Sequence, residues 1–123
     1  MDRHIRQARL AEVGAAGQAR IGRAVVDVGA SGLEADVAIR YLAGGGVGQV
    51  NVRDAALADV ARHIDPAVRV GVDANVADAP TTSFDLRDPV ARAFARGAVL
   101  ALRALRAAIA AEGVAGALAG GRS

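Results

Sequence analysis

Three short stretches rich in valine alternate with stretches of helical period in the middle of this chain. Residues 24–28, 49–53 and 68–72 have the β-branched composition of strands. Residues 33–43 and 56–63 have the apolar spacing of helices, and Gly44 to Gly46 end the first of them. Because strand and helix alternate at this spacing, the pattern predicts right-handed crossovers and parallel strand pairing.

The flanking regions predict further helices. Residues 2–12, capped by Asp2, and residues 18–22 are expected to be helical, whereas residues 73–87 have loop composition. Asp88 followed by Pro89 is typical of a helix start, and this last helix is expected to reach about Glu112. We therefore expect an α/β, Rossmann-like parallel sheet of about three strands with flanking helices and a long C-terminal helix. Residues 1–117 would form one truncated domain, and residues 118–123 a flexible tail.

Polar residues interrupt each predicted strand at alternate positions. A parallel sheet covered on both faces normally has continuously apolar strands. Here alternation places five polar side chains on one face: Asp27, Asn51, Arg53, Arg69 and Asp73. The sequence therefore predicts helices on one face of the sheet and a charged second face. That second face can be solvated, paired internally through Asp27 and an arginine, docked on a partner, or an ion-pair cluster without a role.

Composition excludes several kinds of chemistry. The chain has no cysteine, which excludes disulfides, cysteine zinc sites and cysteine nucleophiles. It also has no lysine, which excludes a lysine–phosphate contact and a Schiff base. His4 and His63 lack the neighbours of a metal site, so none is expected. The absence of a long apolar run and of a signal peptide favours a cytoplasmic protein away from membranes. The scarcity of aromatic residues argues against nucleic-acid binding by base stacking.

Four arginines form a stripe on the predicted C-terminal helix. At 100° per residue, Arg92, Arg96, Arg103 and Arg106 share one side of this helix, opposite to its apolar residues. Such a stripe can bind phosphate, an acidic partner or a membrane surface. It can equally be the ordinary solvated side of a helix that packs on a core.

Several short motifs follow one another in the order seen in one enzyme family. They are Arg3-His-Ile-Arg-Gln7, Gly14-Ala-Ala-Gly-Gln18, the turn Val28-Gly-Ala-Ser-Gly-Leu33, Tyr41-Leu-Ala with Gly46-Val-Gly48, Asp54 at the end of the second strand, and Ile64-Asp-Pro-Ala-Val68. Over residues 3–70 the chain resembles the ubiquitin-activating-enzyme-like adenylyltransferases, the ThiF/MoeB/HesA family. It resembles a truncated and degenerate member.

The resemblance implies an ATP-binding domain that uses Mg-ATP. By that resemblance Gly29, Ser31, Gly32 and Asp54 would hold the nucleotide, with Asp54 on the ribose; the alternative for Asp54 is a cap on the helix that follows. The implied partners are a second copy of the chain or a larger family paralogue, and a ubiquitin-like or sulfur-carrier protein. The family's catalytic arginine, asparagine, lysine and second aspartate have no counterparts here, so no catalytic residue is assigned, and its zinc ligands are missing.

The turn itself departs from the family pattern at two positions. In a Gly-x-Gly-x-x-Gly turn, the second glycine lets the backbone approach phosphate and the third lets helix and strand pack closely. Ser31 and Glu34 occupy these positions, and the Glu34 carboxylate falls in the first helical turn, where it would repel phosphate. Two functions are consistent with this pattern. One is a nucleotide-binding domain that is catalytically incomplete alone, and the other is a non-catalytic interaction or dimerisation module.

Overall fold

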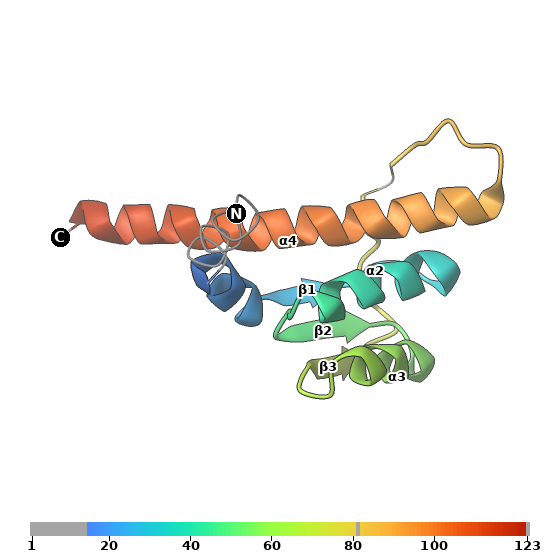
Figure 1. The fold of residues 1–123 in the computed structure, drawn as a ribbon, viewed down its shortest axis with the longest axis horizontal. Coiled ribbons are helices and arrows are strands. Elements are labelled where there is room, and N and C mark those ends of the chain that lie inside the picture. Colours follow the sequence, from blue (N-terminus) through green and yellow to red (C-terminus); the bar gives the residue numbers. More distant parts are fainter. Residues whose placement is uncertain (1–14, 81, 123) are drawn as a thin grey trace, which may run out of the picture.

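A computed structural model describes residues 15–80 and 82–122, and the side chains of these residues up to position 110. After a helix over residues 15–22, the elements are β1 (Val25–Asp27), α2 (Gly32–Gly44), β2 (Gln49–Val52), α3 (Ala55–Ile64), β3 (Arg69–Val72) and α4 (Pro89–Arg122). Figure 1 shows the sheet with α2 and α3 beside it and α4 running along α2. The helix expected over residues 2–12 lies outside the described residues.

The three strands pair in the order β1-β2-β3, and both pairs are parallel. Val26, Val50 and Val70 lie at one register level of the sheet, and Asp27, Asn51 and Gly71 at the next. The predicted α/β fold, with its parallel three-stranded sheet and long C-terminal helix, is confirmed. The arrangement is consistent with a Rossmann-like fold, in which the carboxyl ends of all strands meet at one edge.

The core lies between the sheet and helices α2 and α3. Val50 and Val52 of β2 and Ile39 and Leu42 of α2 are fully buried. The opposite side of β1 bears Val25 and Asp27, which are both exposed. The alternation in the sequence thus reflects a sheet that, among the described residues, has α2 and α3 on one face and polar side chains on the other. We call the other side the open face of the sheet.

The long helix α4 packs against α2 through small residues. Ala101 is buried, and a Cβ atom added to Gly97 would lie 2.8 Å from the Cβ of Val37, so the two helices approach closely there. Leu100, Ala104 and Leu105 pack against the core from the same helix. As a result, α4 extends the hydrophobic core beyond α2.

The start of α4 follows the sequence, whereas its end does not. The Asp88 carboxylate accepts a hydrogen bond from the backbone N–H of Val90 (3.1 Å), and Pro89 is the first helical residue. The helix continues to Arg122, well past the expected end at Gly113, because the glycines there are embedded in an alanine-rich stretch that favours helix. The flexibility expected of residues 118–123 stays a prediction. Within the described residues, no helix combines the length and apolarity needed to span a membrane.

Candidate functional site

A cleft of about 670 Å³ lies at the carboxyl edge of the sheet, between β1 and α4. The turn after β1 lines it on one side and α4 on another, and the loop after β3 contributes residues 77–80 and Thr82. Ligands of open α/β sheets bind in crevices at this edge, just beyond the strand ends. The cleft is therefore the candidate functional site among the described residues.

The turn at the start of α2 leaves backbone donors near the cleft. Ser31 is the N-cap residue, in an extended conformation (φ −136°), but its side chain makes no capping hydrogen bond. The first backbone N–H groups of a helix have no partner within the helix. Gly32 has a φ of +61°, in the left-handed region, which explains glycine at that position. The N-terminus of α2 thus carries positive potential without an internal cap from Ser31.

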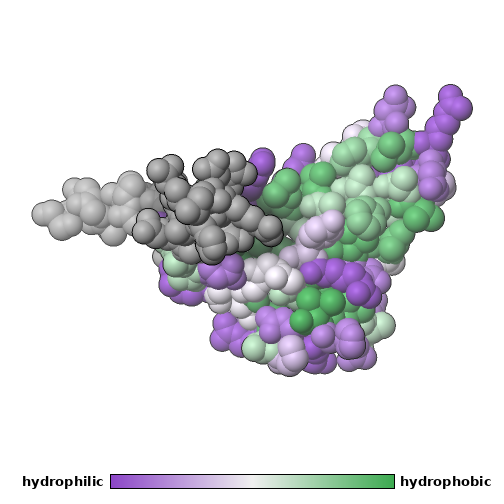
Figure 2. Space-filling view, viewed as in Figure 1, coloured by the Kyte–Doolittle hydropathy of each residue, from purple (hydrophilic) through white to green (hydrophobic). Residues whose placement is uncertain are grey.

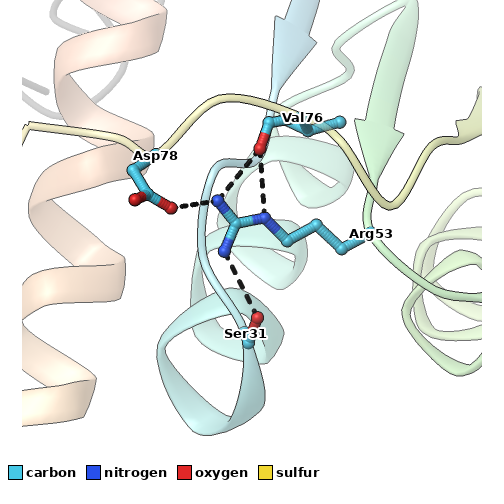
Figure 3. Close-up of polar contacts among 4 residues, drawn as sticks. All are labelled: Ser31, Arg53, Val76 and Asp78. Atoms are coloured by element: carbon cyan, nitrogen blue, oxygen red, sulfur yellow. Dashed lines mark hydrogen bonds and ion pairs between the residues drawn. The ribbon is translucent and has the colours of Figure 1, made fainter.

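Arg53 connects this turn to the loop after β3. Figure 3 shows its guanidinium between Ser31, at the start of α2, and Asp78, in the loop. It donates to the Ser31 hydroxyl (3.4 Å), to the Val76 carbonyl oxygen (3.0 and 3.3 Å) and to the Asp78 carboxylate. The Arg53 side chain is 22% exposed, whereas that of Asp78 is 88% exposed. The guanidinium is therefore fixed in place, while its counter-ion remains open to solvent.

The loop after β3 covers Gly29. The backbone N–H of Ala79 donates to the Gly29 carbonyl oxygen at 2.9 Å. A Cβ atom at Gly29 would lie 2.5 Å from the Ala79 nitrogen and closer still to the Ala77 carbonyl oxygen. Contact with the loop thus accounts for glycine at position 29. We call residues 76–79 the strap, because they pass over the turn and are held by Arg53.

Two arginines of α4 line the opposite wall of the cleft. Arg96 donates to the Thr82 carbonyl oxygen at 3.1 Å, and Arg103 donates to the Thr82 hydroxyl at 3.0 Å. Of the four arginines in the predicted stripe, these two line the cleft, and Arg106 is exposed. The stripe is therefore more than a solvated surface, since half of it faces the candidate site.

Two carboxylates also line the cleft, and they differ in their surroundings. The Asp27 carboxylate accepts a hydrogen bond from the Asn51 side-chain nitrogen (2.8 Å), and the Asn51 oxygen accepts one from Gln49 (3.0 Å). Glu34 is half-buried and has no hydrogen-bond or ion-pair partner among the described residues. The cleft thus has arginines on two sides and an unpaired carboxylate in the first turn of α2.

Asp54 caps the helix that follows it, which is one of the two roles that the sequence allows for this residue. It is the N-cap of α3, and its carboxylate accepts a hydrogen bond from the backbone N–H of Leu57 at 2.9 Å. It does not line the cleft, whereas Gly29 and Ser31 do. Of the predicted nucleotide residues, the structure brings Gly29, Ser31 and Gly32 together at one turn and uses Asp54 as a helix cap. A role for Asp54 on a ribose stays a prediction.

The five polar positions predicted on one face of the sheet have different partners. Asp27 and Asn51 form the hydrogen-bond chain of the open face, and a Cβ atom at Gly71 would lie 2.5 Å from the Asn51 oxygen, so glycine makes room for that chain. Arg53 lies beyond the end of β2 and turns to the strap. The Asp73 carboxylate accepts from the Asn75 N–H (2.9 Å), and Arg69 is exposed, without a side-chain partner among the described residues. Asp27 therefore pairs with an amide, not with an arginine.

Sequence reasoning missed Asp78 and Thr82, which both lie in the long loop after β3. Their partners are arginines 14 to 25 residues away, and nothing in the local sequence marks them. Among the arginines of the cleft, only Arg53 could be placed from the sequence. It follows a predicted strand, and such a position predicts that it lies at the carboxyl edge of the sheet. In the described ranges, no three histidine, aspartate or glutamate side chains are grouped as metal ligands.

Comparison with protein-family models, with curated proteins and with solved structures finds no match to this chain.

Proposed function

We propose that the cleft binds a nucleotide or a similar phosphate ester, and that the chain does not carry out adenylation alone. One observation carries the proposal: Arg53, Arg96 and Arg103 line a single cleft with the N-terminal turn of α2. Arginine is suited to phosphate because its planar fork of N–H donors matches phosphate oxygens in pairs. A helix N-terminus adds backbone donors and a favourable dipole.

The phosphate end of the ligand is assigned to the wall formed by Ser31 and Arg53, which faces the two arginines of α4 across the cleft. Ser31 offers a hydroxyl and Arg53 a guanidinium that is already oriented by the Val76 carbonyl oxygen. Each dipole contact at a helix N-terminus is worth about 0.3–1 kcal/mol, and hydrogen bonds to charged groups about 1.5–3 kcal/mol. Binding in the micromolar range, roughly 8 kcal/mol, is thus within reach of a few such contacts together with burial of a base.

Glu34 and the strap limit which phosphates are expected to bind. The Glu34 carboxylate repels additional negative charge near the first turn of α2, and the strap occupies the approach to Gly29. Both effects disfavour a fully extended triphosphate against Gly29 and favour a ligand with fewer phosphates. By family resemblance the ligand class includes ATP, and the chain would be an incomplete ThiF-like domain that depends on a partner for the missing catalytic residues.

A second candidate function is that of an interaction module. The observation in its favour is the set of large apolar side chains exposed on α2 and α4, among them Tyr41 (49% exposed) and Phe94 (50% exposed). Large exposed apolar patches mark interaction sites in soluble proteins. The two functions use different sides of α4, and one does not exclude the other.

Calorimetric titration with ADP, ATP and pyrophosphate tests the proposal on the full chain. We expect micromolar binding of at least one of the three, and a loss of about tenfold in affinity or more when Arg96 and Arg103 are both replaced by alanine. Arg53→Ala should also weaken binding, but it removes the anchor of the strap as well, so the double variant is the cleaner test.

Arg62→Ala and Arg69→Ala are the matched controls. Both arginines are exposed and neither lines the cleft. If wild-type protein that is folded by circular dichroism binds none of the three probes, the proposal is wrong. It is also wrong if the control variants weaken binding as much as the double variant does, because the attraction would then be a general effect of positive charge.

A further inference from the structure

The guanidinium of Arg53 has two edges, and they are used differently. The edge formed by Nε and Nη2 donates to the Val76 carbonyl oxygen, at 3.3 and 3.0 Å, which fixes the arginine against the strap. Figure 3 shows Nη1 directed to the Ser31 hydroxyl and Nη2 also directed to the Asp78 carboxylate. The hydrogen bond to Ser31 is long, at 3.4 Å. A ligand can therefore take the edge formed by Nη1 and Nη2 while Val76 keeps the guanidinium in place.

Asp78 makes only a limited contact with this second edge. It accepts from Nη2 through one carboxylate oxygen, whereas a matched arginine–carboxylate pair uses two parallel hydrogen bonds. The Asp78 side chain is 88% exposed, so it can turn into water and remain solvated. Ion pairs of such exposed carboxylates contribute little to stability. The Asp78 carboxylate is thus a replaceable internal anion at the position assigned to the phosphate of the ligand.

Three carboxylates line the cleft, and in the described part of the chain Asp78 is the one paired with an arginine. Asp27 accepts from Asn51, and Glu34 has no partner among the described residues. When Asp78 turns away, three arginines and two carboxylates remain in the lining. The lining then has one more positive than negative charge, so it attracts an anion of two charges more than an anion of one.

The two arginines of α4 add attraction for any anion that enters the cleft. Figure 2 shows hydrophobic side chains gathered over the region where Figure 1 places α2 and the described side chains of α4. Arg96 and Arg103 instead line the cleft, where both donate to Thr82, and no described carboxylate pairs with either of them. They therefore draw anions into the cleft in general, and the contacts at Arg53 decide which anion is held there.

Terminal phosphates and phosphodiesters differ in how they compete with Asp78. A carboxylate has one negative charge and two oxygens, and a phosphodiester has the same charge and two free oxygens. Exchange of one for the other therefore brings no net gain at Arg53. A terminal phosphate has a charge of about −1.5 to −2 and three acceptor oxygens. Two of these oxygens can accept from Nη1 and Nη2 of Arg53, and the third can accept from the Ser31 hydroxyl.

We propose that the ligand presents a terminal phosphate, as a mononucleotide does, and that this phosphate replaces the Asp78 carboxylate on Arg53. The inference rests on the proposed function, since it assigns the anion and its position within the same cleft. Every anion that takes this position must first displace Asp78, at the same cost. Only an anion that gains more from Arg53 than the carboxylate does binds appreciably, and a terminal phosphate meets this condition. Phosphodiesters do not, among them dinucleotides, whose bridging phosphates carry one charge each.

Calorimetric titration of the full chain with AMP and with its phosphate methyl ester tests the class of ligand. Both share the nucleoside, and the methyl group removes one charge and one free oxygen from the phosphate. We expect AMP to bind about tenfold more tightly than the ester, because one hydrogen bond to a charged group is lost. If ADP binds and AMP binds no more tightly than the ester, the inference is wrong while the proposed function stands. If neither the nucleotides nor pyrophosphate bind, the proposed function is wrong as well.

Asp78→Asn tests the position of the phosphate. The variant keeps the shape of the side chain and removes the competing charge, so AMP and its ester should both bind about three- to tenfold more tightly, with the ratio of their affinities unchanged. Asp85→Asn is the matched control, because Asp85 is exposed, lies in the same loop after β3 and does not line the cleft. Unchanged affinity in Asp78→Asn, or an equal gain in the control, would overturn the proposal.

A double-mutant cycle separates replacement of Asp78 from a general effect of its charge. In an Arg53→Gln background, Asp78→Asn should change the affinity for AMP less than about twofold, because no guanidinium remains for which phosphate and carboxylate compete. Circular dichroism checks that each variant is folded. The full gain in this background would show that Asp78 acts on the ligand from a distance and that the phosphate does not take its place on Arg53.

Discussion

The N-cap residues of α2 and α3 have the same backbone conformation, but their side chains have different partners. Both helices follow a parallel strand, and both N-cap residues are extended, Ser31 at φ −136° and ψ 168°, and Asp54 at φ −147° and ψ 166°. The Asp54 carboxylate accepts a hydrogen bond from Leu57 within its own helix. The Ser31 hydroxyl instead faces Arg53 and leaves its helix without a side-chain cap.

This difference between the two N-cap side chains means that one helix start contributes to stability and the other is available to bind a ligand. At α3 the Asp54 carboxylate accepts a hydrogen bond from the first turn of the helix, so an external anion is not needed there. At α2 the helix end lines a cleft with three arginines, where an external anion can take the same place. Four substitutions test this contrast.

The largest effect on stability is expected from Gly29→Ala, which places a methyl group against the strap near the start of α2. The added methyl group would overlap with the Ala77 carbonyl oxygen and the Ala79 nitrogen, and backbone atoms cannot move as a flexible side chain does. We expect a loss of about 1–3 kcal/mol in the free energy of unfolding, as for other overpacked sites. Urea denaturation measures it, with Gly17→Ala as the control, since a Cβ atom there meets nothing within 4 Å. Equal stability of the two variants would contradict the described position of the strap.

The next effect is expected from Ser31→Asp, which makes the start of α2 resemble that of α3. The new carboxylate can cap α2 and also attract Arg53, so it occupies the place proposed for phosphate. We expect a higher melting temperature and about tenfold weaker ligand binding. Calorimetric titration and a thermal melt of the same sample measure both. Unchanged binding would mean that the N-terminus of α2 does not contact the ligand.

Asp54→Ala tests the contribution of the N-cap of α3 directly. Loss of the hydrogen bond to Leu57 should cost about 1 kcal/mol of folding free energy, whereas Ser31→Ala, which removes no cap, should cost much less. Ligand affinity should stay the same in Asp54→Ala, since Asp54 does not line the cleft. A large loss of nucleotide affinity in this variant, with little loss of stability, would instead restore Asp54 as the ribose acceptor.

The smallest effect is expected from Glu34→Gln. Removal of the unpaired carboxylate from the first turn of α2 should tighten binding of a phosphate ligand about two- to fivefold. The same change should lower stability slightly, because the helix end loses its only acidic residue. Asp59→Asn on α3 is the control, as Asp59 is exposed and does not line the cleft. Weaker binding by Glu34→Gln would indicate that this carboxylate contacts the ligand favourably.

Local sequence signals were enough to predict the helices and strands, but they were insufficient to predict the cleft. The valine-rich strands, the glycines after α2 and the Asp88-Pro89 start of α4 are decided by neighbouring residues, and the structure confirms them. The alternation of polar residues also predicted a sheet with one open face, as observed. The cleft depends instead on where a long loop and a distant helix pack, and no periodicity in the sequence encodes this.

Gly29 and Asp54 show, at single positions, why the sequence does not predict the site. The sequence shows that Gly29 and Asp54 match a nucleotide-binding pattern, but it does not show which atoms they meet. In the structure, Gly29 is in contact with the strap, and the Asp54 carboxylate binds the backbone of its own helix. Both residue types serve turns and helix caps as readily as ligands, so a motif match cannot separate these uses. The sequence likewise places Arg96 and Arg103 on one side of a helix, and only the packing of α4 shows that this side lines a cleft.

The strand order β1-β2-β3 has a consequence for how the chain folds. Each strand pairs with the next strand along the sequence, so the sheet with α2 and α3 is built from contacts of short sequence separation. Such contacts close small loops and form early, whereas α4 must return to α2 across the whole of β2, α3, β3 and the loop that follows. We therefore expect that, during refolding, the backbone amides of β2 and α2 become protected from hydrogen exchange before those of α4. Helix α4 would then be the last element to join the core.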